Sequence, residues 1–280
     1  MRLSGTSSRI WLVAGTIVAS LFLPTVTRAQ GNPGPITNTL TETDADRQVK
    51  QIMEKGLGDP QAEQAYQAFH RAKQADQKVK LGEAYINKYP LDWHIQAAYE
   101  ELAQTYYSKQ DMANFYQLAD KGIALYPDDV MLLAMSGWAI PRAYKPDDPD
   151  GDARLDKAEK YEKHALEVLK GLTKPASASD QQFETFKTEE SVTAHSALGL
   201  IYFRRGQLED AAKELLEATN NAASPDPTDF LVLGAAYQNL NRFKEAADAY
   251  NRCAQIAGPL QADCKVSADR TAKQAAALAK

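Results

Sequence analysis

The sequence predicts an all-helical chain built from stacked helical hairpins, an α-solenoid. The main observation is a pattern that is written twice between residues 194 and 254. Each matched position recurs 35 residues later, in the pairs Gly199/Gly234, Tyr202/Tyr237 and Ala211/Ala246. A fixed period of about 20–50 residues is typical of stacked-repeat proteins. The composition agrees, because good helix formers dominate and long β-branched runs are absent.

The first 29 residues have the layout of a cleavable secretory signal. Arg2 and Arg9 precede an apolar run over residues 10–23, and the small residues Thr27 and Ala29 follow it. The run has about 14 residues, fewer than the ~20 that a membrane-spanning helix needs. We therefore expect cleavage after Ala29, a periplasmic or secreted protein, and no membrane insertion after cleavage. The alternative is an uncleaved anchor.

The charge balance excludes some classes of partner. The whole chain is 44% hydrophobic and 25% charged, which is ordinary for a folded protein. Residues 1–29 carry three of the 32 basic residues and no acidic residue, so the mature chain has 29 basic and 37 acidic residues and a net charge near −8. An acidic exported protein is a poor candidate for nucleic acid or an anionic membrane surface. We expect a protein or peptide partner. The sequence specifies neither the identity of this partner nor the oligomeric state of the chain.

Breaks in the helical periodicity divide the chain. The expected order is a signal peptide (1–29), a flexible linker (30–44), an N-terminal helix with a divergent hairpin (45–90), a hairpin (91–129), a hairpin (130–172) with a Pro/Asp-rich insertion (141–152), a loop and helix extension (173–191), two hairpins (192–226 and 227–257) and a capping helix (258–280).

Local signals justify these elements in turn. In the divergent hairpin, Asp59 followed by Pro60 predicts a helix start, and Lys78 stands where a small residue is expected. In the third hairpin, Gly137 marks a helix-contact point, and Asp152 is expected to cap the second helix from about Leu155.

The later elements have their own signals. Ser179 with Gln182 predicts a capping box at the start of a long helix. The last helix is rich in alanine and lysine, which is typical of a polar-faced cap on a repeat stack.

The spacing of small and large residues resembles the tetratricopeptide repeat. The matching positions are Leu198, Gly199, Tyr202, Gly206, Ala211, Leu215 and Ala218, and again Leu233, Gly234, Tyr237, Ala246, Tyr250 and Cys253. The resemblance covers roughly residues 90–257 well and 59–90 weakly. It implies a right-handed superhelix of about four to five hairpins with a C-terminal capping helix. The whole layout is also similar to exported tetratricopeptide proteins of acidobacteria-type Gram-negative bacteria.

The resemblance further implies a concave groove lined by the first helix of each hairpin. The groove residues that we single out as protein-binding are Tyr107, Trp138, Arg142, Phe203, Arg204, Gln238 and Asn239. Aromatic and arginine side chains are enriched among interface hot spots. The alternative is that these aromatic residues pack between hairpins. The asparagine and lysine clamp that some family members use to bind a C-terminal carboxylate is absent at the matching places.

The two cysteines, Cys253 and Cys264, both lie in the exported part. An oxidising compartment permits a disulfide between them, and a turn at Gly258-Pro259 can bring their Cα atoms within the ~6 Å that a bridge needs. The disulfide would pin the terminal helix. The alternative is two free thiols that act as small apolar residues.

No motif predicts catalysis, a metal site or a cofactor. Asp148, Asp150, Asp152 and Glu159 have EF-hand-like spacing, but the required glycine would fall at Ala153, so a solvated loop is favoured over calcium. The four histidines are scattered without ligand spacing, and no phosphate-binding loop or nucleophile elbow is present.

The sequence therefore favours a non-catalytic interaction scaffold of the cell envelope, which binds a peptide or protein segment in its concave groove. The alternative is an accessory or recruiting subunit of an envelope enzyme or assembly complex. A hidden enzymatic site is the third hypothesis.

Overall fold

The computed structural model describes residues 44–54, 58–175 and 178–278. The expected signal peptide lies outside these ranges, as does the linker apart from Asp44. Within the described ranges the chain is all-helical and contains no strand. None of the helices described there is both long and apolar enough to cross a membrane.

The helices follow one another closely along the chain. They are α1 (Asp44–Glu54), α2 (Pro60–His70), α3 (Ala75–Lys88), α4 (Ile95–Ser108), α5 (Met112–Leu125), α6 (Val130–Arg142), α7 (Gly151–Gly171), α8 (Asp180–Arg204), α9 (Leu208–Asn221), α10 (Pro227–Asn239), α11 (Phe243–Gln255) and α12 (Gln261–Leu278).

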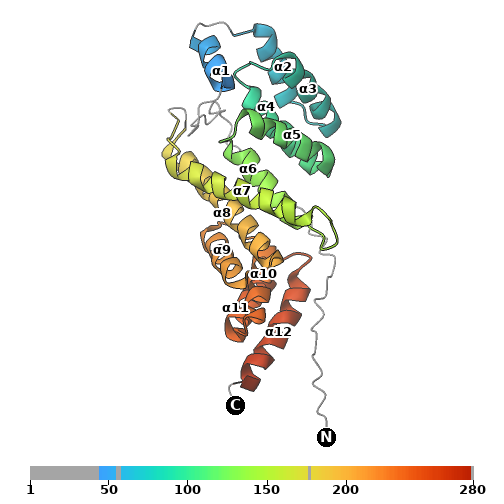
Figure 1. The fold of residues 1–280 in the computed structure, drawn as a ribbon, viewed down its shortest axis with the longest axis vertical. Helices are drawn as coiled ribbons and strands as arrows, with labels where there is room; N and C mark the ends of the chain where they lie inside the picture. Colours follow the sequence, from blue (N-terminus) through green and yellow to red (C-terminus); the bar gives the residue numbers. More distant parts are fainter. Residues whose placement is uncertain (1–43, 55–57, 176–177, 279–280) are drawn as a thin grey trace.

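Helices α2 to α11 form five successive hairpins in one elongated row, which α12 closes at the far end (Figure 1). From α2 onward every helix contacts the next one. Each even-numbered helix also contacts the next even-numbered helix, whereas no two odd-numbered helices in the described ranges pack together to a similar extent. The even-numbered helices therefore line the inner side of the row. This arrangement confirms the predicted all-helical solenoid.

Glycines set the close approach of the two helices within several hairpins. A Cβ atom added at Gly199 of α8 would lie within 3 Å of the Leu215 side chain in α9. The same holds for Gly234 of α10 and Tyr250 of α11. The repeat pattern therefore reflects helix packing, because a glycine on one helix leaves space for a large side chain from the next helix.

Helix starts follow the capping chemistry that the sequence signals. Asp59 accepts a hydrogen bond from the Gln61 backbone N–H, and Pro60 occupies the first turn of α2. Ser179 and Gln182 form the predicted capping box at the start of α8. Each cap satisfies backbone donors that have no partner inside the helix.

The helix count is higher than expected, since α1 and five complete hairpins precede the cap in the described residues. The non-helical segment in the third hairpin is also shorter than the expected insertion, because α6 continues to Arg142 and α7 begins at Gly151. Asp152 lies inside the first turn of α7 and is not its cap; the cap position belongs to Asp150.

The end of α6 contains Pro141, which has no backbone N–H to donate to the preceding turn. The helix nevertheless continues to Arg142, whose guanidinium donates a hydrogen bond to the Trp138 carbonyl (3.3 Å). A basic side chain near a helix C-terminus satisfies carbonyls that the helix leaves open. This contact fixes the direction of the Arg142 side chain.

At the C-terminal end of the row, Cys253 of α11 and Cys264 of α12 form a disulfide, with their Cα atoms 5.8 Å apart. Both cysteines are fully buried beside Phe230 of α10. The bridge joins the cap to the last hairpin. Stable disulfides are typical of proteins outside the reducing cytosol, so the bridge points to a non-cytoplasmic location.

Candidate functional site

A pocket of about 400 Å³ opens on the inner side of the row, where α6, α8 and α10 meet the loop between α11 and α12. Its lining is Trp138, Arg142, Val192, Thr193, Ser196, Ser224, Pro225, Asp226, Pro227, Thr228, Asp229, Ile256, Ala257, Gly258, Pro259 and Leu260. We call it the inner pocket. Three successive hairpins and the capping loop contribute to it, so the pocket exists only when the repeats are stacked.

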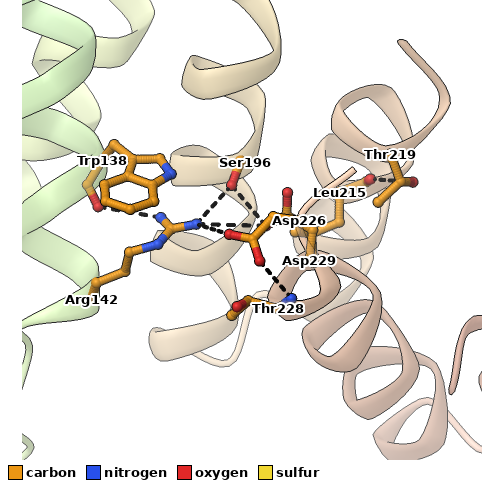
Figure 2. A network of polar contacts seen from close by, with 8 residues as sticks. All are labelled: Trp138, Arg142, Ser196, Leu215, Thr219, Asp226, Thr228 and Asp229. Atoms are coloured by element: carbon orange, nitrogen blue, oxygen red, sulfur yellow. Dashed lines mark hydrogen bonds and ion pairs between the residues drawn. The ribbon is translucent and has the colours of Figure 1, made fainter. Parts of the chain in front are cut away.

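Arg142 is the centre of the polar contacts in the inner pocket. Its Nη2 donates to the Ser196 Oγ (3.0 Å) and lies 3.5 Å from Asp226 Oδ2 and 3.7 Å from Asp229 Oδ1. Figure 2 shows these partners converging on one guanidinium from α8 and α10. The side chain is only 7% exposed. A buried arginine needs such partners, since an uncompensated buried charge is costly.

Trp138 supports the same guanidinium from one turn earlier in α6. The Arg142 Cζ lies 3.6 Å from the centroid of the Trp138 ring, a cation–π contact. Trp138 packs in turn against Tyr107 of α4, with ring centroids 6.0 Å apart and an edge-to-face geometry. Arg142 is therefore fixed on one side by an aromatic stack and on the other by acids.

Asp229 is the most perturbed acid of the inner pocket. Burial raises the pKa of Asp229 to about 7, and the nearby Asp226 carboxylate adds to the rise, whereas Arg142 and Ser196 oppose it. Ser196 Oγ donates a hydrogen bond to Asp229 Oδ1 (2.7 Å). The carboxyl of Asp229 thus changes charge near neutral pH.

Asp226 has a structural and an electrostatic role. Its side chain caps α10 by accepting a hydrogen bond from the Thr228 backbone N–H (2.8 Å), between two prolines. Its side chain is 34% exposed, against 6% for Asp229. Asp226 is therefore the acid of the pair that an incoming group meets first.

A second buried acid lies close to Arg142. Glu162 of α7 packs against Gly137 of α6, and neither of its carboxyl oxygens has a hydrogen-bond partner among the described residues. Burial, reinforced by the charge of Glu190 and opposed by Arg142, raises the pKa of Glu162 well above its usual value. Burial therefore favours the protonated form of this side chain at the joint between α6 and α7.

The expected groove residues fall into two groups. Trp138 and Arg142 line the inner pocket, and Tyr107 is buried behind Trp138. The others lie toward the C-terminal ends of α8 and α10, outside the pocket lining. There Arg204 is exposed and its Cζ lies 5.8 Å from the Tyr144 ring, and Phe203 is half-buried against the C-terminal core.

Gln238 and Asn239 have contacts within their own hairpin. Gln238 accepts a hydrogen bond from the Tyr250 hydroxyl (3.1 Å), and exposed Asn239 donates to the Ala235 carbonyl (2.9 Å). The structure therefore does not bring these two residues together with Trp138 and Arg142.

Sequence reasoning did not assign the pocket acids Asp226 and Asp229 or the buried Glu162. A signal for Asp226 was present, since an acid between two prolines is typical of a helix cap. For Glu162 the signal is its position in the repeat. When the insertion before α7 is removed, Glu162 aligns with Leu215 and Tyr250 of the later hairpins.

A second hollow of about 450 Å³ lies between α7, α8 and α9, and is lined among others by Lys187, Ser191 and His195. His195 Nδ1 lies 2.6 Å from Glu214 Oε2. Of the acids with EF-hand-like spacing, Asp148 pairs with Arg154, and Glu159 pairs with Arg205 and Lys163. In the described part of the chain no three His, Cys, Asp or Glu residues gather into a possible metal site.

Comparisons with known proteins do not assign the chain to a family. No protein-family model matches the chain, and no curated protein matches it. Among solved structures, a thermophilic TPR protein of Thermus thermophilus is similar, with 18% identity and a TM-score of 0.47 over 82% of this chain and 98% of that chain. A likeness at this identity transfers no residue, ligand or partner to the chain described here.

Proposed function

We propose that this protein is a non-catalytic interaction scaffold of the cell envelope, which binds a peptide or protein segment along the inner side of its helical row. The observation that carries the proposal is the inner pocket itself. Its walls come from three stacked hairpins and the capping loop, and it combines apolar surface with a fixed charged group. Concave sites of this kind, mostly apolar with a few placed polar groups, are typical binding sites.

The envelope location has separate support. The N-terminal 29 residues have the layout of a cleavable signal, and the Cys253–Cys264 disulfide suits an oxidising compartment. N-terminal sequencing of the exported protein tests the location. The expected first residue is Gln30, and an intact Met1 in the membrane fraction would contradict cleavage.

A site-specific cross-linking experiment tests binding along the inner side. A photo-crosslinking amino acid replaces half-buried Thr193 in the inner pocket, or exposed Lys213 on α9 as the control. In the living source cell, a discrete adduct is expected from position 193 and not from position 213. Adducts from 213 alone, or from neither position, would contradict inner-side binding.

The same adduct separates the scaffold from the alternative, an accessory or recruiting subunit of an envelope enzyme or assembly complex. Mass spectrometry of the adduct identifies the cross-linked chain and the segment that reached position 193. A stoichiometric enzyme subunit would favour the alternative.

A further inference from the structure

The inner pocket has one basic and two acidic side chains in its lining. The base, Arg142, is already engaged by Asp226, Asp229, Ser196 and the Trp138 carbonyl. The more exposed acid of the lining, Asp226, has 34% of its side chain accessible to solvent, against 7% for Arg142. An incoming group therefore meets an acid, and the lining carries a net negative charge when both carboxyls are ionised.

Apolar side chains form another part of the lining. Val192 of α8 and the loop residues Ile256, Pro259 and Leu260 also line the pocket. Val192, Ile256 and Leu260 are half-buried and Pro259 is exposed, so part of their surface faces solvent in the unbound chain. A long side chain with an apolar stem and a charged tip matches such a site, because the stem covers apolar wall while the tip reaches the acid.

We propose that the inner pocket receives a lysine or arginine side chain of the segment that the protein binds. The basic tip reaches Asp226 at the edge of the network, and the hydrocarbon stem lies along Val192 and the loop over residues 256–260. This inference rests on the proposed function and specifies the chemistry of its partner.

An acidic side chain is a poor occupant of the same pocket. To reach the Arg142 guanidinium, a carboxylate would have to displace Asp226 and Asp229. Asp229 is 6% exposed and would remain buried without its cation, which is a costly state. The aromatic stack with Trp138 also covers one face of the guanidinium.

Binding of a base should couple to the charge of Asp229. The groups that face its carboxyl are Arg142 from α6, Ser196 from α8 and Asp226 from the start of α10. An added cation favours the ionised form of Asp229, whose pKa lies near 7. The affinity for a basic side chain is therefore expected to increase as the pH rises from 6 to 8.

The test uses end-blocked pentapeptides, Ala-Ala-X-Ala-Ala, in which X is lysine, arginine, norleucine or glutamate. Binding to the mature chain is measured from NMR shifts of the Trp138 indole and the Thr193 amide. The lysine and arginine peptides are expected to bind about tenfold more tightly than the norleucine peptide, and the glutamate peptide least tightly. Butylamine, which has the basic tip without a segment, is expected to bind more weakly than the lysine peptide.

Asp226→Asn is the decisive variant, because asparagine also caps helices well and should preserve α10. It is expected to remove the preference for lysine over norleucine. The matched control is Asp210→Asn, an exposed acid in the first turn of α9, which should retain the preference. Circular dichroism of both variants verifies that the helices remain.

Several results would overturn the inference. They are equal or tighter binding of the norleucine or glutamate peptide, binding of butylamine as tight as that of the lysine peptide, no binding of any probe, or an unchanged preference in folded Asp226→Asn. The cross-link from position 193 separates the two proposals. If it persists in Asp226→Asn while the peptides fail, inner-side binding stands and the basic occupant is wrong.

Discussion

The hairpin α6–α7 and the two hairpins α8–α9 and α10–α11 use the same helix crossing with opposite chemistry. In each hairpin, the first helix has a glycine at the crossing. A long side chain of the second helix lies within 3 Å of the position that a Cβ atom on this glycine would occupy. That side chain is Leu215 or Tyr250 in the later hairpins and Glu162 in the earlier one. The crossing therefore requires length and shape, but it tolerates a carboxyl in place of an apolar group.

The difference lies in how the polar atoms are satisfied. The Tyr250 hydroxyl donates to Gln238 Oε1 (3.1 Å), whereas both oxygens of Glu162 lack a hydrogen-bond partner in the described part of the chain. Leaving a buried polar group unsatisfied costs on the order of 1–3 kcal/mol. The α6–α7 crossing is thus the weaker joint, and it is also the one that carries Trp138 and Arg142 into the inner pocket.

Truncation gives the largest expected contrast between the two crossings. Leu215→Ala removes a fully buried side chain from an apolar crossing and is expected to cost about 2–5 kcal/mol of unfolding free energy. Glu162→Ala also leaves a cavity, but it removes the unsatisfied carboxyl, so its cost is expected to be much smaller. Urea unfolding followed by circular dichroism measures both. Equal losses would show that the two crossings are energetically alike.

Removing the disulfide tests whether the C-terminal hairpins are stabilised by the packing at their helix crossings or by the covalent cross-link. The bridge joins residues 11 apart, and removing a loop constraint of this length is expected to cost about 3 kcal/mol. Cys253→Ala/Cys264→Ala is compared with the oxidised wild type by thermal unfolding. Without the disulfide, α12 is expected to fray, whereas the hydrogen-exchange protection of α6 and α7 is expected to stay unchanged. Loss of protection in α6 and α7 would mean that the whole row unfolds as one unit.

Replacing Glu162 by the apolar residue found at the equivalent position of a later hairpin should stabilise the α6–α7 crossing. Glu162→Leu copies Leu215 and is expected to raise the unfolding free energy by about 1–3 kcal/mol at pH 5. Glu162→Gln keeps the shape and a polar end, so it serves as the control and should gain less. A loss of stability in Glu162→Leu would mean that the carboxyl has partners that the folded chain needs.

The pH dependence gives the finest test of the same comparison. Burial raises the pKa of Glu162, so the folded state retains a proton that the unfolded chain releases above about pH 4.5. Stability therefore falls as the pH rises from that value toward the folded pKa, by at most about 1.4 kcal/mol per pH unit for one proton. Asp229, whose pKa is also raised, contributes in the same direction.

The measurement is the unfolding free energy of wild type and Glu162→Gln between pH 5 and pH 8. Glu162→Gln retains the contribution of Asp229, so the difference between the two slopes isolates Glu162. Wild type is expected to lose more stability than the variant as the pH rises. Parallel curves would show that Glu162 is ionised in the folded chain.

Much of the fold was predictable because its signals are local. Gly199 and Leu215 lie in one hairpin, and the Ser179–Gln182 cap spans a single turn, so each is visible within a short stretch of sequence. The site was predictable only in part. Trp138 and Arg142 were singled out as groove residues, but their acidic partners were not.

The sequence by itself determined that this chain forms helical hairpins, where most of them start, and which residues without side chains admit the next helix. Those properties follow from the 3.6-residue helical period and from a repeat of about 35 residues. Only the tertiary structure decided the inner pocket. Arg142 meets Ser196 and Asp226 across separations of 54 and 84 residues, which depend on how three hairpins stack. Likewise, Glu162 lies at the α6–α7 crossing only because the segment between these helices brings α7 back to the packing position that the second helix has in the later hairpins.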